Sequence, residues 1–251
     1  MVEAPLILQT EDLTKHFGAI PAAEGLNIGV EQRELVGIVG PNGSGKTTFL
    51  NLVTGYLEPD RGRILFMGQE TTGLPPREII KLGVARSFQI PQLYTLLSVL
   101  ESLLLSLAAE SGNGGSFWQP LFGKTRIAEG LETLERFGLK DYAYRAVSEL
   151  PEGGRKLLDI AMSFALKPKL LLMDEPTSGV SIEDKFEVMD TLVKVLQESD
   201  ITTVFVEHDM EVVQRYGLRV LVFNDGQVIA DGKPDSVLAD PEVRKTVLGG
   251  D

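Results

Sequence analysis

A complete phosphate-binding loop constrains the fold of this chain more than any other feature. Residues 40–48 read Gly-Pro-Asn-Gly-Ser-Gly-Lys-Thr-Thr, which matches the pattern Gly-x4-Gly-Lys-Ser/Thr in full. The apolar run 34–39 before it predicts a buried strand, and residues 47–53 after it predict a helix. A glycine-rich turn that matches by chance is the alternative, but the strand–loop–helix context favours a P-loop NTPase core of the α/β class.

The P-loop predicts how a nucleotide would be held. Its glycines allow backbone N–H groups to close around phosphate oxygens, and the helix that follows adds a favourable dipole. We expect the Lys46 ammonium to reach the β- and γ-phosphates of ATP and the Thr47 hydroxyl to bind Mg²⁺. The predicted nucleotide contacts are Gly40, Pro41, Asn42, Gly43, Ser44, Gly45, Lys46, Thr47 and Thr48.

Composition narrows the class of protein. The chain has 251 residues, and its net charge of −12 argues against a nucleic-acid-binding face, which usually needs a basic patch. It has no cysteine, so it offers neither a disulfide nor a thiolate metal site. No apolar run is long enough to span a bilayer, and the N-terminus lacks a secretory signal pattern. These features predict a cytoplasmic location.

Periodicity predicts a split nucleotide-binding core with a helical insertion. Leucines recur at helical spacing from Leu93 to Leu107, and residues 125–165 are mostly helical in pattern. Strands are predicted on both sides of this stretch, at 6–13, 26–30, 63–67, 170–173, 201–206, 219–223 and 227–230. We therefore predict a core at 1–89 and 166–251, which includes an N-terminal antiparallel β subdomain, and a helical subdomain at 90–165.

Two carboxylates end a predicted strand. Asp174 and Glu175 follow the apolar run 170–173, which has the pattern of a parallel strand buried on both faces. Simple solvation would explain an acidic pair in isolation. In a chain with a complete P-loop, we expect Asp174 to hold Mg²⁺ through water and Glu175 to polarise the attacking water.

Three further side chains are candidates by their position. His208 follows the predicted strand 201–206 and could donate a hydrogen bond to a γ-phosphate, although a surface histidine is the alternative. Gln89 lies where the core passes into the insertion and could touch Mg²⁺ or the attacking water. Phe17 could stack on adenine, whereas spacing alone would equally fit a core phenylalanine.

The order of these motifs resembles the ATP-binding-cassette (ABC) ATPases. The P-loop is followed by Gln89, a Gly-Gly segment before a helix, Leu-Leu-Leu-Met-Asp-Glu-Pro-Thr, and Glu-His-Asp, and the resemblance covers nearly the whole chain. It implies that two such domains sandwich two ATP molecules and that each P-loop is completed by the partner's signature segment. It also implies that the Gln89 region meets a membrane permease subunit.

A narrower resemblance is to the ATPases of branched-chain amino acid importers. It rests on residues 83–89, Gly-Val-Ala-Arg-Ser-Phe-Gln, and on the ending at 239–249. The wider group includes importers of polar and hydrophobic amino acids, urea and amides. The resemblance implies an ATP-hydrolysing subunit that lies peripherally on the inner face of the cell membrane, beside permease subunits and a second ATPase subunit. Residues 90–103 are the predicted permease contact.

The chain departs from the family pattern in its signature. The family has Leu-Ser-Gly-Gly-Gln, and residues 150–154 here are Leu-Pro-Glu-Gly-Gly. Pro151 lacks a hydroxyl and an N–H donor, and Glu152 brings a carboxylate to where a γ-phosphate should approach. Gly153 and Gly154 remain as expected contacts to the partner's nucleotide. Ser181 replaces a family aspartate, and together these changes predict a heterodimer.

Two other function classes stay open at this point. One is a soluble ABC-type ATP switch, against which the acidity and the lack of a second cassette count. The other is a regulatory ATP-binding subunit with little turnover, which the altered signature would explain.

Overall fold

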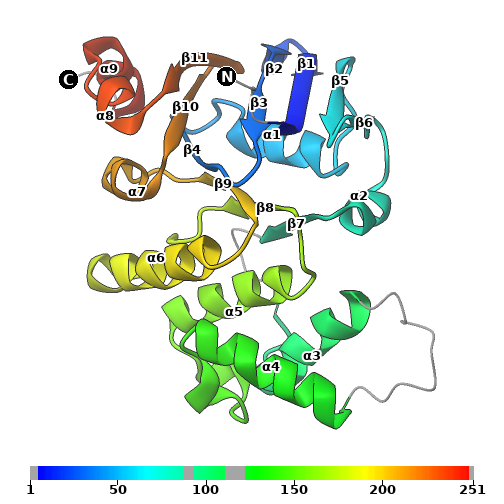
Figure 1. The fold of residues 1–251 in the computed structure, drawn as a ribbon. Coiled ribbons are helices and arrows are strands. Elements are labelled where there is room, and N and C mark those ends of the chain that lie inside the picture. Colours follow the sequence, from blue (N-terminus) through cyan, green and yellow to red (C-terminus); the bar gives the residue numbers. More distant parts are fainter. Residues whose placement is uncertain (1–4, 88–92, 111–121, 249–251) are drawn as a thin grey trace. The chain divides into compact units, whose positions relative to one another are not determined.

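The computed structural model describes residues 5–87, 93–110 and 122–248, and the chain divides into two compact units (Figure 1). Unit 1 joins the N-terminal 84 residues to residues 201–251, and unit 2 covers residues 85–200. Both units combine strands with helices, which confirms the predicted α/β class.

The first group of strands in unit 1 is antiparallel. It consists of β1 (Leu6–Phe17), β2 (Ile20–Leu26), β3 (Gly29–Glu31), β5 (Arg61–Phe66) and β6 (Gln69–Glu70). β1 pairs with β2, β3 and β5, so it is the central strand of the group. The predicted N-terminal antiparallel β subdomain is therefore confirmed, and β1 extends beyond the predicted 6–13.

The single strand predicted at 26–30 is wrong, because β2 ends at Leu26 and β3 begins at Gly29. The buried Thr10 explains the interruption. Its hydroxyl donates to the Leu26 carbonyl at 3.0 Å and accepts from the Ile28 N–H at 3.0 Å. A side chain thus satisfies backbone groups that a continuous ladder would otherwise pair.

The second group of strands in unit 1 surrounds the strand that leads into the P-loop. It consists of β4 (Leu35–Val39), β9 (Thr202–Val206), β10 (Arg219–Asn224) and β11 (Gln227–Gly232). β4 pairs in parallel with both β9 and β10, and β10 forms an antiparallel hairpin with β11. β4 is apolar throughout and all five residues of β9 are buried, which fits this central position.

The helices of unit 1 are α1 (Lys46–Val53), α2 (Pro76–Leu82), α7 (Met210–Tyr216), α8 (Pro234–Val237) and α9 (Pro241–Leu248). α1 packs against β10 through the rings of Phe49 and Phe223, whose centroids are 5.7 Å apart. Both rings are fully buried, so the helix that follows the P-loop is fixed on the sheet.

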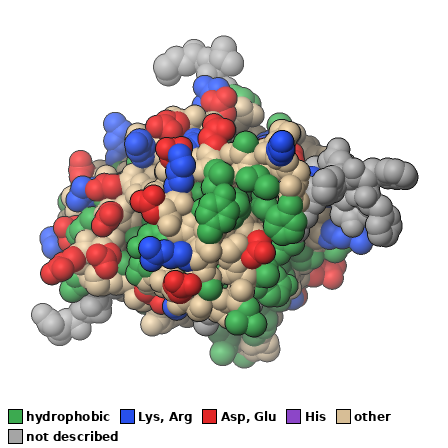
Figure 2. All heavy atoms as spheres, turned by 90° about the horizontal axis from the view of Figure 1, so that it is seen from below, with side chains coloured by type: hydrophobic (Ala, Val, Ile, Leu, Met, Phe, Trp, Pro, Cys, Tyr) green, Lys and Arg blue, Asp and Glu red, His purple; other side chains and the backbone are tan. Residues whose placement is uncertain are grey.

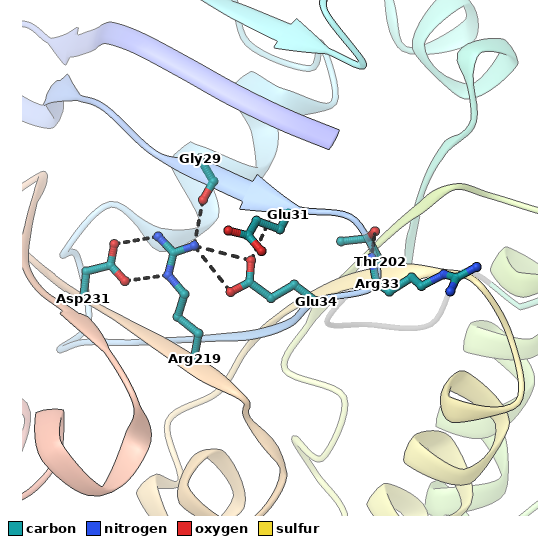
Figure 3. Close-up of polar contacts among 7 residues, drawn as sticks. All are labelled: Gly29, Glu31, Arg33, Glu34, Thr202, Arg219 and Asp231. Carbon is teal, nitrogen blue, oxygen red and sulfur yellow. Dashed lines mark hydrogen bonds and ion pairs between the residues drawn. The ribbon is translucent and has the colours of Figure 1, made fainter. Parts of the chain in front are cut away.

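A polar cluster joins the strands of unit 1 at Arg219 (Figure 3). The guanidinium binds both carboxylate oxygens of Asp231 at 2.6 Å and donates to the Gly29 carbonyl at 2.8 Å. It also lies 3.4 Å from the Glu34 carboxylate. The hydrogen bond with Asp231 is the main cause that raises the pKa of Arg219 above its ordinary value. The cluster thus links β10, β11 and β3 to the start of β4.

Unit 2 is mostly helical. It contains β7 (Val84–Ser87, from Ala85 on), β8 (Leu170–Asp174), α3 (Val99–Glu110), α4 (Lys124–Arg136), α5 (Glu152–Phe164), α6 (Ile182–Gln197) and the 3₁₀ turns η1 (Lys140–Tyr142) and η2 (Val147–Glu149). The predicted helical subdomain at 90–165 is narrower than unit 2, and that boundary stays a prediction. None of the helices in the described part of the chain is long and apolar enough to cross a membrane.

The helix predicted from Leu93 begins only at Val99. Ser98 and Glu101 form a reciprocal cap: the Ser98 N–H donates to the Glu101 carboxylate at 2.7 Å, and the Glu101 N–H donates to the Ser98 hydroxyl at 3.2 Å. This capping box fixes the start of α3. Leu96, inside the predicted helix, is 94% exposed, so the leucine spacing between 93 and 98 does not reflect a buried helix face.

Candidate functional site

The P-loop in unit 1 connects β4 to α1. Gly45 is the N-cap residue of α1, with φ of 103°, no side chain caps the helix, and its first turn carries no acidic residue. A Cβ atom at Gly40 would lie 2.2 Å from the Phe223 carbonyl oxygen, and one at Gly45 would lie 2.2 Å from that of Ala22. Only glycine fits at these two positions, and the helix N-terminus is left open to an anion.

The polar side chains of the loop fit a phosphate. Lys46 is only 5% exposed, and its ammonium donates to the carbonyls of Gly40 at 2.8 Å and Pro41 at 2.9 Å. The Ser44 hydroxyl is buried and has no hydrogen-bond partner among the described residues. A held cation, an unsatisfied hydroxyl and an uncapped helix N-terminus together suit the phosphates of ATP. Thr47 is exposed beside them.

His208 lies at the same sheet edge as the P-loop. Ile38 of β4 pairs with Val206 of β9, so the two strands end together and His208 follows two residues later. The side chain of His208 is exposed. The Asp209 carboxylate accepts from the N–H of Glu211 at 2.9 Å and caps α7. The structure therefore brings a histidine and a phosphate loop to one edge of unit 1.

Phe17 is the last residue of β1 and is 50% exposed. It pairs across the β1–β2 hairpin with Ile20, which is also exposed. The alternative that Phe17 is a core residue is therefore wrong. The same hairpin carries Ala22, whose carbonyl lies against Gly45, so the hairpin runs beside the P-loop within unit 1.

Asp174 and Glu175 lie in unit 2 at the end of β8. The Asp174 carboxylate is 3% exposed, and its Oδ2 lies 2.6 Å from Nη2 of Arg86. Its Oδ1 is buried and has no hydrogen-bond partner in the described part of the chain. An unsatisfied buried carboxylate oxygen suits a water molecule or hydrated cation such as Mg²⁺. No group of three or more His, Asp or Glu side chains that could hold a metal by themselves occurs among the described residues.

Glu175 has a left-handed backbone conformation, with φ of 51°. It lies directly after β8, outside the strand. The Lys156 ammonium, almost fully buried on α5, donates to the Glu175 carbonyl at 3.2 Å. A non-glycine residue in this conformation persists only where its surroundings hold it, and Lys156 supplies one such contact.

Sequence reasoning missed Arg86 and Lys156. Arg86 lies in β7, a short strand that is otherwise buried, and its side chain is 6% exposed. Lys156 lies on the buried face of α5, which carries both apolar and polar side chains. The sequence did carry one signal for both residues: a cation stands where the burial pattern calls for an apolar side chain. Because a charge is buried only together with a partner, such a cation indicates a specific contact.

The signature segment forms the start of α5. Pro151 is the N-cap residue, and Gly153 and Gly154 lie inside the first turn, not before the helix as predicted. The Glu152 carboxylate has a counter-ion in Arg155 at 3.6 Å, although both side chains are well exposed and the pair is weak. The missing N–H of Pro151 costs no helical hydrogen bond, because it precedes the helix.

A pocket of about 330 Å³ lies beside this segment in unit 2. Its apolar walls come from α5, α6 and the turns near η1, while Asp184 and Glu187 of α6 add two carboxylates. The negative charge of the signature region therefore extends beyond Glu152. Ser181, the other departure from the family, caps α6 by accepting from the Asp184 N–H at 3.1 Å, so serine keeps the capping role that aspartate also performs.

Gln89 lies outside the described residues, and its predicted role stays a prediction. The remaining predicted site residues fall into two sets. Phe17, the P-loop and His208 belong to unit 1, whereas Asp174, Glu175, Gly153 and Gly154 belong to unit 2.

Comparison with known proteins identifies the family. A family model described as ABC transporter matches residues 23–178. The chain belongs to the ABC transporter family. It is 36% identical to the probable branched-chain amino acid transport ATP-binding protein LivG of Archaeoglobus fulgidus, over 97% of this chain and 95% of that protein. It is 33% identical to the high-affinity branched-chain amino acid transport ATP-binding protein BraF of Pseudomonas aeruginosa, over 97% and 98%.

Solved structures agree with this assignment. The ADP conformation of MJ1267, an ATP-binding cassette of an ABC transporter, matches with a TM-score of 0.86 and 32% identity, over 97% of this chain and 99% of that one. A dimeric, post-hydrolysis state of the cassette MJ0796 bound to ADP and phosphate matches with a TM-score of 0.77 and 28% identity, over 90% and 98%. The chain is therefore an ABC ATPase, and the predicted fold, family and activity are confirmed.

Proposed function

We propose that this ABC ATPase powers the import of branched-chain amino acids, or of related amino acids, urea or amides. The observation that carries the proposal is the match of 97% of the chain to two subunits named for branched-chain amino acid transport. The importer assignment predicts that the chain works at the inner face of the cell membrane beside permease subunits.

The proposal gives each site residue a role. Lys46 and the loop amides hold the β- and γ-phosphates, Phe17 stacks on adenine, and His208 donates a hydrogen bond to the γ-phosphate. Thr47, Gln89 and Asp174 are the protein groups proposed to hold Mg²⁺, which neutralises phosphate charge when it is bound. Glu175 takes the proton of the attacking water. Phosphoryl transfer needs positioning and charge stabilisation above all, and these residue types provide both.

Two variants separate binding from turnover. Lys46→Ala removes the cation that holds the loop, and we expect it to lose nucleotide binding. Glu175→Gln keeps the size of the side chain but is a far weaker base, so ATP affinity should persist while most turnover disappears. Glu135→Gln, at an exposed ion pair on α4, is the matched control. Normal turnover in Glu175→Gln would refute the role of Glu175.

The proposed permease contact includes residues 90–103. Tyr94 and Leu96, in the described part of this stretch, are large apolar side chains that are well exposed. Figure 2 views the molecule from the side of α3 and α4, and hydrophobic side chains form a group on this face. Such groups on a protein surface mark interaction sites.

Cross-linking tests this contact cleanly, because the chain has no native cysteine. We expect Leu96→Cys to cross-link to a permease loop. Ile229→Cys, also exposed on β11 but less so than Leu96, is the control and should not cross-link. Cross-links from residue 229 alone would place the permease contact elsewhere.

The altered signature supports a heterodimer. The carboxylates of Glu152, Asp184 and Glu187 near the start of α5 oppose a partner's γ-phosphate. We propose that a second ATPase subunit donates an intact signature to this chain's P-loop, while the reciprocal site turns over slowly. Restoring the family residues with Pro151→Ser and Glu152→Gly should increase ATP-dependent dimerisation. Unchanged dimerisation and turnover, alone and with the partner, would contradict the proposal.

A soluble ATP switch that acts on nucleic acid is the competing function. The net charge of −12 disfavours a nucleic-acid partner, and we propose none. Co-purification with membranes supports the importer, whereas co-purification with nucleic acid would support the switch. Steady-state ATPase activity, measured with the partner present, distinguishes a hydrolysing transport subunit from a regulatory subunit with little turnover.

A further inference from the structure

Arg86 and Asp174 form a buried ion pair within unit 2. The distance from Nη2 to Oδ2 is 2.6 Å, and the two side chains are almost fully buried. Arg86 lies in β7 and Asp174 ends β8, and the backbone of β7 is held in turn by Ser163 of α5, whose hydroxyl donates to the Arg86 carbonyl at 3.1 Å. Water screens the two charges of such a buried pair only weakly, so each of them interacts strongly with other charges nearby.

The two oxygens of Asp174 are in different situations. Oδ2 is neutralised by the guanidinium, whereas Oδ1 is buried and unsatisfied among the described residues. An arginine stays protonated at any physiological pH. A divalent cation that approaches Oδ1 therefore meets a carboxylate whose negative charge is already compensated by a fixed positive charge nearby.

We infer that Arg86 is a positioning residue that acts through Asp174 as a built-in counter-ion. It holds Oδ2 of the buried carboxylate and leaves Oδ1 available, and its charge keeps a divalent cation weakly bound until nucleotide phosphates bring further negative charge. The metal then enters together with the nucleotide. This inference rests on the proposed function, which assigns Asp174 to Mg²⁺.

Coulombic repulsion gives the expected sign. Removing the guanidinium charge while keeping a hydrogen-bond donor should strengthen cation binding at Asp174 in the absence of nucleotide. Arg86→Gln does this, because its amide is a neutral donor, although the side chain is two bonds shorter than that of arginine. Arg86→Lys keeps the charge but loses the planar guanidinium. If the charge of Arg86 controls cation affinity, only Arg86→Gln strengthens cation binding. If Arg86 acts only by orienting the Asp174 carboxylate, neither variant strengthens it.

The experiment measures Mn²⁺ binding to the full chain without nucleotide, from the electron paramagnetic resonance signal of free Mn²⁺. We expect Arg86→Gln to bind Mn²⁺ at least about ten-fold more tightly than the wild type, since unscreened charges at short range interact strongly. Arg86→Lys should stay within about two-fold of the wild type by the same reasoning. Arg136→Gln, which breaks an arginine–glutamate pair of 3.7 Å between a partly buried arginine and an exposed glutamate in the same unit, is the control and should leave Mn²⁺ binding unchanged.

Loss of a buried partner could prevent Arg86→Gln from folding. In that case Mn²⁺ present during refolding should recover folded protein, because the cation replaces the missing counter-ion. Failure of Mn²⁺ to do so, or Mn²⁺ binding by folded Arg86→Gln that is unchanged or weaker, overturns the inference.

Asp174→Asn distinguishes this inference from the proposed function. If Asp174→Asn weakens Mn²⁺ binding in the presence of ATP but Arg86→Gln has no effect without ATP, only the counter-ion role is wrong. If Asp174→Asn leaves Mn²⁺ binding with ATP unchanged, the metal-ligand role of Asp174 fails as well. Combining Asp174→Asn with Arg86→Gln should abolish the gain in Mn²⁺ affinity.

Discussion

Replacing Arg219 with methionine should destabilise unit 1 measurably. Arg219 is 23% exposed, and its guanidinium bonds to Asp231 at 2.6 Å through two nitrogens and to the Gly29 carbonyl at 2.8 Å. Methionine keeps the apolar stem and removes all of these donors. The carbonyl of Gly29 and the 17% exposed carboxylate of Glu34 would then lose a partner in a place that water reaches poorly.

The expected loss in the free energy of unfolding depends on how deeply the partners of Arg219 are buried. Breaking a fully buried ion pair costs roughly 3–5 kcal/mol, and hydrogen bonds to charged groups contribute roughly 1.5–3 kcal/mol. Because the Asp231 side chain is 43% exposed, water replaces part of what is lost. We therefore expect a loss of about 2–3 kcal/mol in the free energy of unfolding, or about 5–10 °C in Tm for a chain of this length.

Differential scanning calorimetry measures this, with Arg61→Met as the matched control. Arg61 and Asp12 also lie 2.6 Å apart, but their side chains are 71% and 53% exposed. An exposed pair contributes roughly 0–1 kcal/mol, so the control should shift Tm little. Equal Tm shifts in the two variants would show that distance, and not burial, sets the cost of breaking such a pair.

Three further changes test other parts of the structure. Gly45→Ala should abolish nucleotide binding, measured by calorimetric titration, because its Cβ would overlap the Ala22 carbonyl at 2.2 Å; retained affinity would contradict this. Thr10→Val should cost about 2–3 kcal/mol in a urea titration, because two buried backbone groups lose their partner. Glu101→Gln should remove a pH-dependent part of stability. Hydrogen bonds from the Ser98 backbone and then its hydroxyl lower the pKa of Glu101 below 4.5, so the stabilisation is present above that pH and is lost as pH falls through the folded value. Wild type and variant should therefore differ in Tm at pH 6 and converge in acid.

The sequence predicted the P-loop, the strand before it and the helix after it, because the loop motif and the hydrophobic patterns on both sides agree there. The glycines of the loop, the apolar run before it and the helix after it all require the same geometry. The predicted start of α3 was too early, because the leucine spacing continues on the N-terminal side of Ser98. The Ser-x-x-Glu capping box at Ser98 and Glu101 marks the true helix start in the sequence itself.

The sequence predicted those site residues that belong to a recognisable motif. It missed those whose role depends on tertiary contacts. Asp174 and His208 are marked by strand ends, which sequence periodicity shows. Arg86 is distant in sequence from its partner Asp174, and Lys156 meets a backbone carbonyl that no side-chain pattern reveals. Only the fold brings such pairs together, so periodicity alone assigned them no role.

Transport by reconstituted vesicles tests the central claim most directly. The vesicles would contain the permease subunits, the second ATPase subunit and this chain, with branched-chain amino acid uptake and ATP hydrolysis measured together. We predict ATP-dependent uptake with the wild type and neither uptake nor full hydrolysis with Glu175→Gln, which still binds ATP. Undiminished uptake with Glu175→Gln, or wild-type hydrolysis that never drives uptake of any amino acid, urea or amide, would contradict the account.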